Sequence, residues 1–174
     1  MNKWLLAGIA GIAVQQGVQQ RFEVQERRQV FKQARDYADS VGKPLLVVGS
    51  PKFRYNHPCG DVTIDISPEM AKFCDGLVAD IREIPYPGGY FGAAFASHVV
   101  EHLATIEDAK VALDEMYRVA DRVFIVSPRK SSLMAWVNPG HHLWVIPSGD
   151  GYVIEQRGNR LPKEESYIIS MEVV

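Results

Sequence analysis

The sequence has little of what marks several classes of protein. Its 174 residues include only two cysteines, Cys59 and Cys74, too few for a disulfide-built fold or a zinc knuckle. We expect both to be small core residues in a reducing compartment. The net charge of -2 provides no basic surface, so no nucleic-acid partner is expected. The composition, 47% hydrophobic and 23% charged, is ordinary for one globular domain.

The sequence also lacks an apolar run of about 20 residues, the length that a membrane-spanning helix needs. The longest such run, Trp4 to Val14, has eleven uncharged residues and is followed by two glutamines. A run of this length fits a helix that lies on a membrane or contacts a partner, a helix buried in the fold, or a cleaved signal segment. We therefore treat residues 1–18 as an apolar N-terminal helix and a candidate anchor, with membrane contact through residues 4–18. The expected location is the cytoplasm, with or without membrane anchoring.

Short apolar runs then alternate with helical patterns, which favours a parallel sheet covered by helices. Residues 19–42 have the periodicity of an amphipathic helix that ends at Gly42. The remaining segment, 43–174, is predicted to form strands at 45–48, 62–66, 77–79, 93–99 and 122–126, with a helix at 106–119. After Gly140, the runs at 143–146, 152–156 and 167–174 are separated by glycine turns and predict antiparallel strands. The predicted fold class is α/β, a three-layer sandwich with a Rossmann-like, mostly parallel sheet and antiparallel C-terminal edge strands.

Four groups of residues between Lys43 and Val126 resemble the class I methyltransferases that use S-adenosylmethionine, closest to the small type 11 group. No single group is specific, but their order and spacing together are. They are Val47-Val48-Gly49, Thr63-Ile64-Asp65-Ile66-Ser67, Ala79-Asp80-Ile81 with Ile84-Pro85-Tyr86, and Ser97 to Leu103 followed by Leu113 to Val119.

The resemblance implies that S-adenosylmethionine binds at the carboxyl ends of the strands, where the strand order reverses. Asp65 would accept hydrogen bonds from the ribose hydroxyls, and Asp80 would face the adenine amine. Taken alone, the two aspartates also fit a helix N-cap and a turn residue. The residues that the resemblance assigns to the cofactor are Gly49, Ser50, Asp65, Ile66, Asp80, Ile81 and Ser97.

Histidines follow the fourth and fifth predicted strands. The resemblance places His98 beside the methyl donor and His102 near the acceptor, so both are candidate catalytic residues, because histidine can act as a general base. His141 and His142, in a loop after the fifth strand, are candidate substrate-binding residues. His98 to His102 also matches the H-x-x-E-H zinc pattern, which needs one helix. Because a strand is predicted there, no metal site is expected.

The first loop departs from the family pattern. The family has several glycines after the first strand, whereas here Gly49 is followed by Ser50 to Gly60, with two prolines and no glycine before Gly60. Either another arrangement holds the donor, with Lys52 or Arg54 gripping its carboxylate, or the donor is not held. Two functions remain open: a methyltransferase acting on a small or membrane-proximal acceptor, and an inactive methyltransferase-fold scaffold or subunit anchored through its N-terminal helix.

Overall fold

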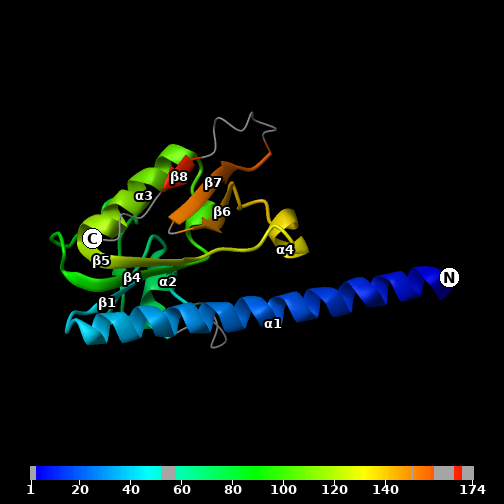
Figure 1. Cartoon of the computed structure of the whole chain (residues 1–174), viewed down its shortest axis with the longest axis horizontal. Coiled ribbons are helices and arrows are strands. Elements are labelled where there is room, and N and C mark those ends of the chain that lie inside the picture. The colour runs from blue at the N-terminus through cyan, green and yellow to red at the C-terminus, as the bar shows by residue number, and fades with distance from the viewer. Residues whose placement is uncertain (1–2, 52–57, 150, 159–166, 170–174) are drawn as a thin grey trace.

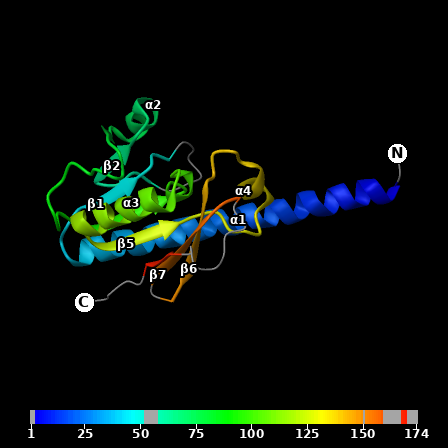
Figure 2. The same cartoon turned by 90° about the horizontal axis from the view of Figure 1, so that it is seen from above.

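The computed structural model describes residues 3–51, 58–149, 151–158 and 167–169, with side chains described for 14–51, 58–149 and 151–158. Its longest element is helix α1 (Lys3–Ser40), which lies along one side of the molecule (Figures 1 and 2). The elements that follow are β1 (Leu45–Val48), β2 (Val62–Asp65), α2 (Pro68–Ala71), the 3₁₀ helix η1 (Lys72–Cys74), β3 (Leu77–Val78), β4 (Phe91–Ser97), the 3₁₀ helix η2 (Val100–His102), α3 (Ile106–Val119), β5 (Ala120–Val126), α4 (Leu133–Val137), β6 (Leu143–Ser148), β7 (Gly151–Gln156) and β8 (Tyr167–Ile169).

Five strands form one parallel sheet in the order β3-β2-β1-β4-β5. The chain adds β2 and β3 on one side of β1 and then crosses to the other side to add β4 and β5. The strand order therefore reverses at β1, and a crevice is expected outside the carboxyl ends of β1 and β4. This arrangement confirms the predicted α/β class with a Rossmann-like parallel sheet.

Alternate residues of the central strands face two separate cores. On one face, Leu45 and Val47 of β1 pack with Phe95 of β4 against α1, where the Phe31 and Phe95 rings meet edge to face at 5.4 Å. On the other face, buried residues of β1 and β4 pack against α3. Because both faces of the sheet are covered, every residue of β1 is buried, and each of them is apolar.

Helix α1 joins two segments that the sequence pattern treats separately. Its 38 residues run without a break through the apolar N-terminal segment and the amphipathic one. The N-terminal half of the helix projects beyond the sheet and its covering helices (Figure 1). Among the described residues, no helix is long and apolar enough to span a membrane. The division of the chain into the segments 1–18, 19–42 and 43–174 stays a prediction.

The C-terminal strands differ from the prediction in their position. β6, β7 and β8 pair antiparallel, as expected, but they form a separate sheet rather than extending the edge of the parallel sheet. Leu143, Val145 and Ile154 of this sheet belong to the core on the α3 side. Packing across that core buries their apolar side chains, and a turn pattern in the sequence does not specify which surface a hairpin packs against.

The prediction for the two cysteines is wrong. Cys59 and Cys74 form a disulfide, with their Cα atoms 5.7 Å apart. Cys59 precedes β2 and Cys74 precedes β3. Because these strands pair in parallel, both cysteines lie near the amino ends of the strands. The bond removes the argument for a reducing compartment, because that argument assumed two isolated thiols.

Reduction of this disulfide is expected to lower the free energy of unfolding by about 3 kcal/mol, because a cross-link between residues 15 apart restricts the unfolded chain. Urea unfolding with and without a thiol reductant measures the effect. The Cys59→Ser/Cys74→Ser double variant should have the stability of the reduced protein and should not respond to the reductant. An unchanged midpoint for the reduced wild-type protein would contradict this expectation.

Candidate functional site

A cavity of about 520 Å³ lies at the carboxyl ends of β1, β2 and β4 and beside the residues that follow β3. All seven residues predicted to hold the donor line this cavity, and so do His98 and His102. The parallel sheet brings them together because each of them lies at or just after the end of a strand. That these residues bind a donor stays a prediction, whereas their position in one cavity is a feature of the structure.

Gly49 forms the exit of β1 and allows the chain to turn there. Its φ of +83° favours glycine, and a Cβ atom at this position would lie 2.5 Å from Cγ2 of Val99. Its N–H donates to the carbonyl of Ile64 at 2.9 Å. Among the described residues of the following loop, none is helical. Lys52 and Arg54, the candidate partners of the donor's carboxylate, lie outside the described residues.

Asp65 connects the ends of β1 and β2. Its Oδ2 accepts from the backbone N–H of Ser50 at 2.8 Å, and its Oδ1 accepts from that of Ser67 at 2.8 Å. Asp65 is not the N-cap of α2, because the hydroxyl of Ser67 accepts from the Met70 N–H instead. A carboxylate oxygen can accept more than one hydrogen bond, so Asp65 keeps accepting capacity for ligand hydroxyls.

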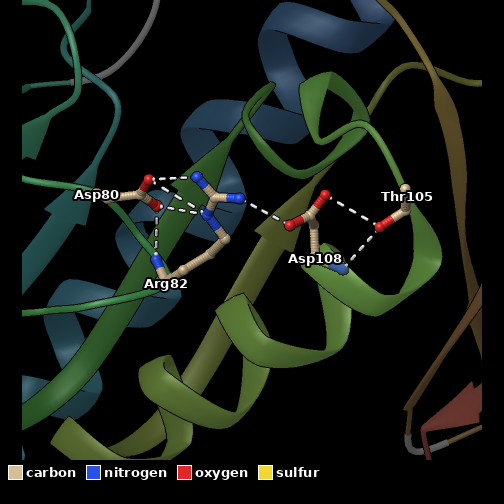
Figure 3. Close-up of polar contacts among 4 residues, drawn as sticks. All are labelled: Asp80, Arg82, Thr105 and Asp108. Carbon is tan, nitrogen blue, oxygen red and sulfur yellow. Dashed lines mark hydrogen bonds and ion pairs between the residues drawn. The ribbon is translucent and has the colours of Figure 1, made fainter.

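Asp80 already has a cationic partner (Figure 3). The Arg82 side chain donates to both carboxylate oxygens, at 2.6 Å from Nη2 and at 3.0 and 3.2 Å from Nε. Its remaining nitrogen donates to Asp108 at 2.7 Å, and Thr105 holds Asp108 through two hydrogen bonds of 3.0 Å. The hydrogen bonds from Arg82 lower the pKa of Asp80. Asp80 is therefore an ionised group on a turn that is tied to the start of α3.

Two further residues of α3 hold the segment that follows Asp80. Glu115 accepts from the N–H of Ile84 at 3.0 Å, and Arg118 donates to the carbonyls of Ile84 and Tyr86 at 2.9 and 2.8 Å. Arg118 and Glu115 also pair with each other at 2.7 Å. Sequence analysis missed this clamp and Arg82. The spacing of Glu115 and Arg118 predicts a pair on one helix face, but it does not reveal a backbone partner.

Two hydroxyl groups in the cavity have unused hydrogen-bonding capacity. Ser50 Oγ and Ser97 Oγ are buried and make no hydrogen bond among the described residues, although both side chains line the cavity. A buried polar group without a partner costs about 1–3 kcal/mol. Rotation of the two serine side chains would bring the hydroxyls into the cavity, where the polar groups of a ligand could satisfy them.

His98 lies at the edge of the cavity in a strained backbone conformation. Its φ of +56° is uncommon for a residue with a side chain. Its N–H donates to Val126 at 2.8 Å, and its Nδ1 lies 3.4 Å from Oε1 of Glu101. This geometry fixes the direction in which the imidazole leaves the end of β4.

Glu101 is the residue of the site that sequence analysis missed most clearly. Its side chain is only 2% exposed, and burial raises the pKa of its carboxyl to about 7, against the opposing effects of the Ser127 hydroxyl and of Arg27 on α1. Ser127 Oγ donates to Oε2 at 3.2 Å. The sequence signals for Glu101 are its place as an acid within the run Val99 to Leu103 and as the glutamate of the H-x-x-E-H pattern.

Of the remaining histidines, His102 and His141 contact each other, and His142 is exposed. The His102 and His141 rings meet edge to face at 4.7 Å, and Nδ1 of His102 lies 2.8 Å from the carbonyl oxygen of Gly140. His141 is only 8% exposed, and burial lowers its pKa, whereas His142 is exposed. Because His98 precedes the short 3₁₀ helix η2, His98 and His102 do not share one turn of an α-helix as the zinc-peptidase pattern requires.

Residues 53–122 match the family model described as a methyltransferase domain. This match covers less than half of the chain, and it confirms the resemblance to the methyltransferases that the sequence motifs indicate. The match contains Asp65, Asp80 and His98 but begins after Gly49 and Ser50. Of the loop that departs from the family pattern, residues 50–52 precede the matched segment and residues 53–60 lie within it.

Two solved structures have a remote likeness to the chain. The N-methyltransferase NodS from Bradyrhizobium japonicum WM9, in complex with S-adenosyl-L-homocysteine, is 14% identical, with 67% of this chain and 74% of that chain covered and a TM-score of 0.45. The PH0226 protein from Pyrococcus horikoshii OT3 is 16% identical, with 75% and 69% covered and a TM-score of 0.41. At these values neither structure identifies a function for this chain. No curated protein matches the sequence significantly.

Proposed function

We propose that the protein is an S-adenosylmethionine-dependent methyltransferase that acts on a small or membrane-proximal acceptor. The observation that carries the proposal is the cavity at the strand-order reversal, which Asp65 and Asp80 line together with Ser50 and Ser97. When bound, the cofactor would supply a methyl group activated by its sulfonium centre. The protein would contribute binding, orientation and the exclusion of water.

Each residue of the cavity would contact a different part of the cofactor or the acceptor. Asp65 would accept from the two ribose hydroxyls, because both of its oxygens keep accepting capacity. Asp80 would accept from the adenine amine while Arg82 keeps it ionised. Gly49 lets the backbone at the end of β1 approach the ligand without a side chain. His98, which the backbone at the end of β4 orients, would accept a hydrogen bond from the acceptor group, and His102 would lie on the same side.

Titration of the full-length protein with S-adenosylmethionine and with S-adenosylhomocysteine tests this proposal. A ligand at 100 times its dissociation constant adds about 2.7 kcal/mol to the stability of the folded state, so the melting temperature should rise by several degrees. Adenosine should also raise the melting temperature, and inosine, which lacks the amine facing Asp80, should raise it less. No shift with any of these ligands would refute the proposal and leave the alternative of an inactive scaffold.

We also propose that residues 4–18 contact a membrane surface. The N-terminal half of α1 projects beyond the sheet (Figure 2), and Val14, Val18 and Phe22 form an exposed apolar stripe with a spacing of four residues. An exposed stripe that continues an apolar helical segment fits the interfacial region of a bilayer.

Vesicles that contain phosphatidylserine test this contact. The full-length protein should sediment with the vesicles, and the Val14→Glu/Val18→Glu variant should lose most of this binding because it places two charges on the apolar stripe. Gln15→Glu/Gln20→Glu adds the same charge at exposed polar positions of the helix and should retain more binding. Equal sedimentation of wild-type protein and both variants would contradict the proposal.

A further inference from the structure

We propose that Glu101, His102 and His141 form a binding site for a divalent transition-metal ion, with zinc as the expected ion. One ligand atom from each residue lies within 4.8 Å of those of the other two. Glu101 and His102 belong to η2, and His141 lies in the loop before β6. The N–H of His142 donates to the carbonyl of Glu101 at 2.7 Å, which holds the two segments together. This site is independent of the proposed methyl donor.

The hydrogen bonds of His102 prepare one of its nitrogens to bind a metal. Its Nδ1 lies 2.8 Å from the carbonyl oxygen of Gly140. Because a carbonyl oxygen only accepts, Nδ1 carries the hydrogen and Nε2 has the free lone pair. A ring nitrogen that donates to a backbone carbonyl while the other binds the ion is the common arrangement of metal-binding histidines.

The surroundings of His141 define its lone pair in the same way. The N–H of Gly140 donates to Oδ1 of Asn138 at 3.0 Å, so the Asn138 amide nitrogen faces the ring, 2.9 Å from Nε2 of His141. An amide nitrogen only donates, so the lone pair of His141 is on Nε2, where it accepts from Asn138. Burial lowers the pKa of His141 and favours the neutral imidazole that a metal requires. A bound ion would replace the Asn138 contact.

Glu101 supplies an independent observation that favours a cation. Its side chain is almost fully buried. Ser127 donates to Oε2, and Arg27 of α1 is a nearby positive charge. Oε1 makes no hydrogen bond among the described residues and lies 3.4 Å from Nδ1 of His98. Burial of a carboxylate is costly unless the group is paired, hydrogen-bonded or bound to a metal. A metal ion beside Oε1 would offset this cost.

The ligand set selects the kind of ion. Two imidazoles and one carboxylate suit zinc and related transition metals, whereas magnesium and calcium prefer ligands that are all oxygen. Three protein ligands leave a fourth position of a tetrahedral ion open, as in catalytic zinc sites. Since His102 also lines the large cavity, the site borders the side of the cavity where an acceptor is expected.

Zinc titration of the chelator-treated, full-length protein, without any methyl donor, tests the proposal. We expect one zinc ion per chain by calorimetry and elemental analysis, and no comparable binding of magnesium. His102→Ala and His141→Ala should each weaken zinc binding at least about 10-fold, because a lost ligand costs no less than a lost supporting residue. Glu101→Gln preserves the size of the side chain and removes the charged ligand, so it should also weaken binding.

His142→Ala is the matched control, because His142 is an exposed neighbour outside the three-residue group. It should bind zinc as the wild-type protein does. Circular dichroism and thermal unfolding establish that each variant is folded before titration. Absence of zinc binding by the folded wild-type protein, unchanged binding by His102→Ala, or an equal loss in His142→Ala would overturn the proposal. Because these measurements use no donor, their failure would leave the methyltransferase proposal unaffected.

Discussion

Asp65→Ala is expected to weaken the binding of S-adenosylhomocysteine strongly, whereas Asp61→Ala is expected to preserve it. The two aspartates lie at opposite ends of β2, and each accepts a backbone N–H from the β1 segment: Asp61 from Leu45 at 2.7 Å and Asp65 from Ser50 at 2.8 Å. Only Asp65 lines the cavity. Each hydrogen bond to a charged group contributes about 1.5–3 kcal/mol, so the loss of two ribose contacts should weaken binding by about 100-fold or more.

This comparison separates a role in binding from a role in stability. Both variants should lose stability, because each removes the acceptor of a backbone N–H, and urea unfolding without ligand measures that loss. Calorimetric titration with S-adenosylhomocysteine then measures binding at a temperature where both variants are folded. If Asp65→Ala binds as tightly as the wild-type protein, the proposed ribose contact is wrong. If Asp61→Ala loses binding to the same extent, the effect of Asp65 is structural.

Glu101→Ala is expected to lower the free energy of unfolding by about 3 kcal/mol, because it leaves a buried cation without one of its nearby charges and opens a cavity. Arg27 on α1 is only 9% exposed, and its pKa is lowered by burial, while the nearby Glu23 and Glu101 oppose that shift. Ser127 would lose its acceptor in the same variant.

Glu101→Gln is the matched variant for this experiment. It keeps the volume of the side chain and an oxygen that can accept from Ser127 but removes the same charge, so it should cost less than Glu101→Ala by the contribution of the cavity. Urea unfolding in the presence of a metal chelator measures both variants without any contribution from a bound ion. Equal stability of Glu101→Ala and the wild-type protein would show that the carboxyl group does not stabilise the contact between α1 and the site.

Much of the fold and part of the site could be predicted from the sequence. The apolar runs at 45–48 and 62–66 became β1 and β2 with almost the predicted bounds, because a strand buried on both faces has a continuous apolar signature. Asp65 and Asp80 were placed correctly in one cavity, since residues that follow parallel strands meet at one edge of the sheet. These features depend on local patterns and on one general property of parallel sheets.

Other features depended on partners distant in the sequence. No local pattern indicates that the Arg82 side chain donates hydrogen bonds both to Asp80 and to Asp108 at the start of α3. Glu101 is buried in a segment, η2, that packs against β6, and Arg27 of α1 lies close enough to affect its carboxyl group. Both neighbours are distant from Glu101 in the sequence. The periodicity of a sequence indicates which side of a segment is buried, but it does not indicate which other segment packs against that side.

The sequence by itself determined which segments form the strands of the parallel sheet and the direction in which they pair, because these follow from periodicity, glycine positions and chain direction. It did not fix every strand end, since β4 spans Phe91–Ser97 where 93–99 was predicted. Only the tertiary structure decided that two cysteines join, that the last strands form their own sheet and that three residues from two segments gather beside the cavity. Such contacts depend on which surfaces pack together, and packing is decided by the whole chain at once.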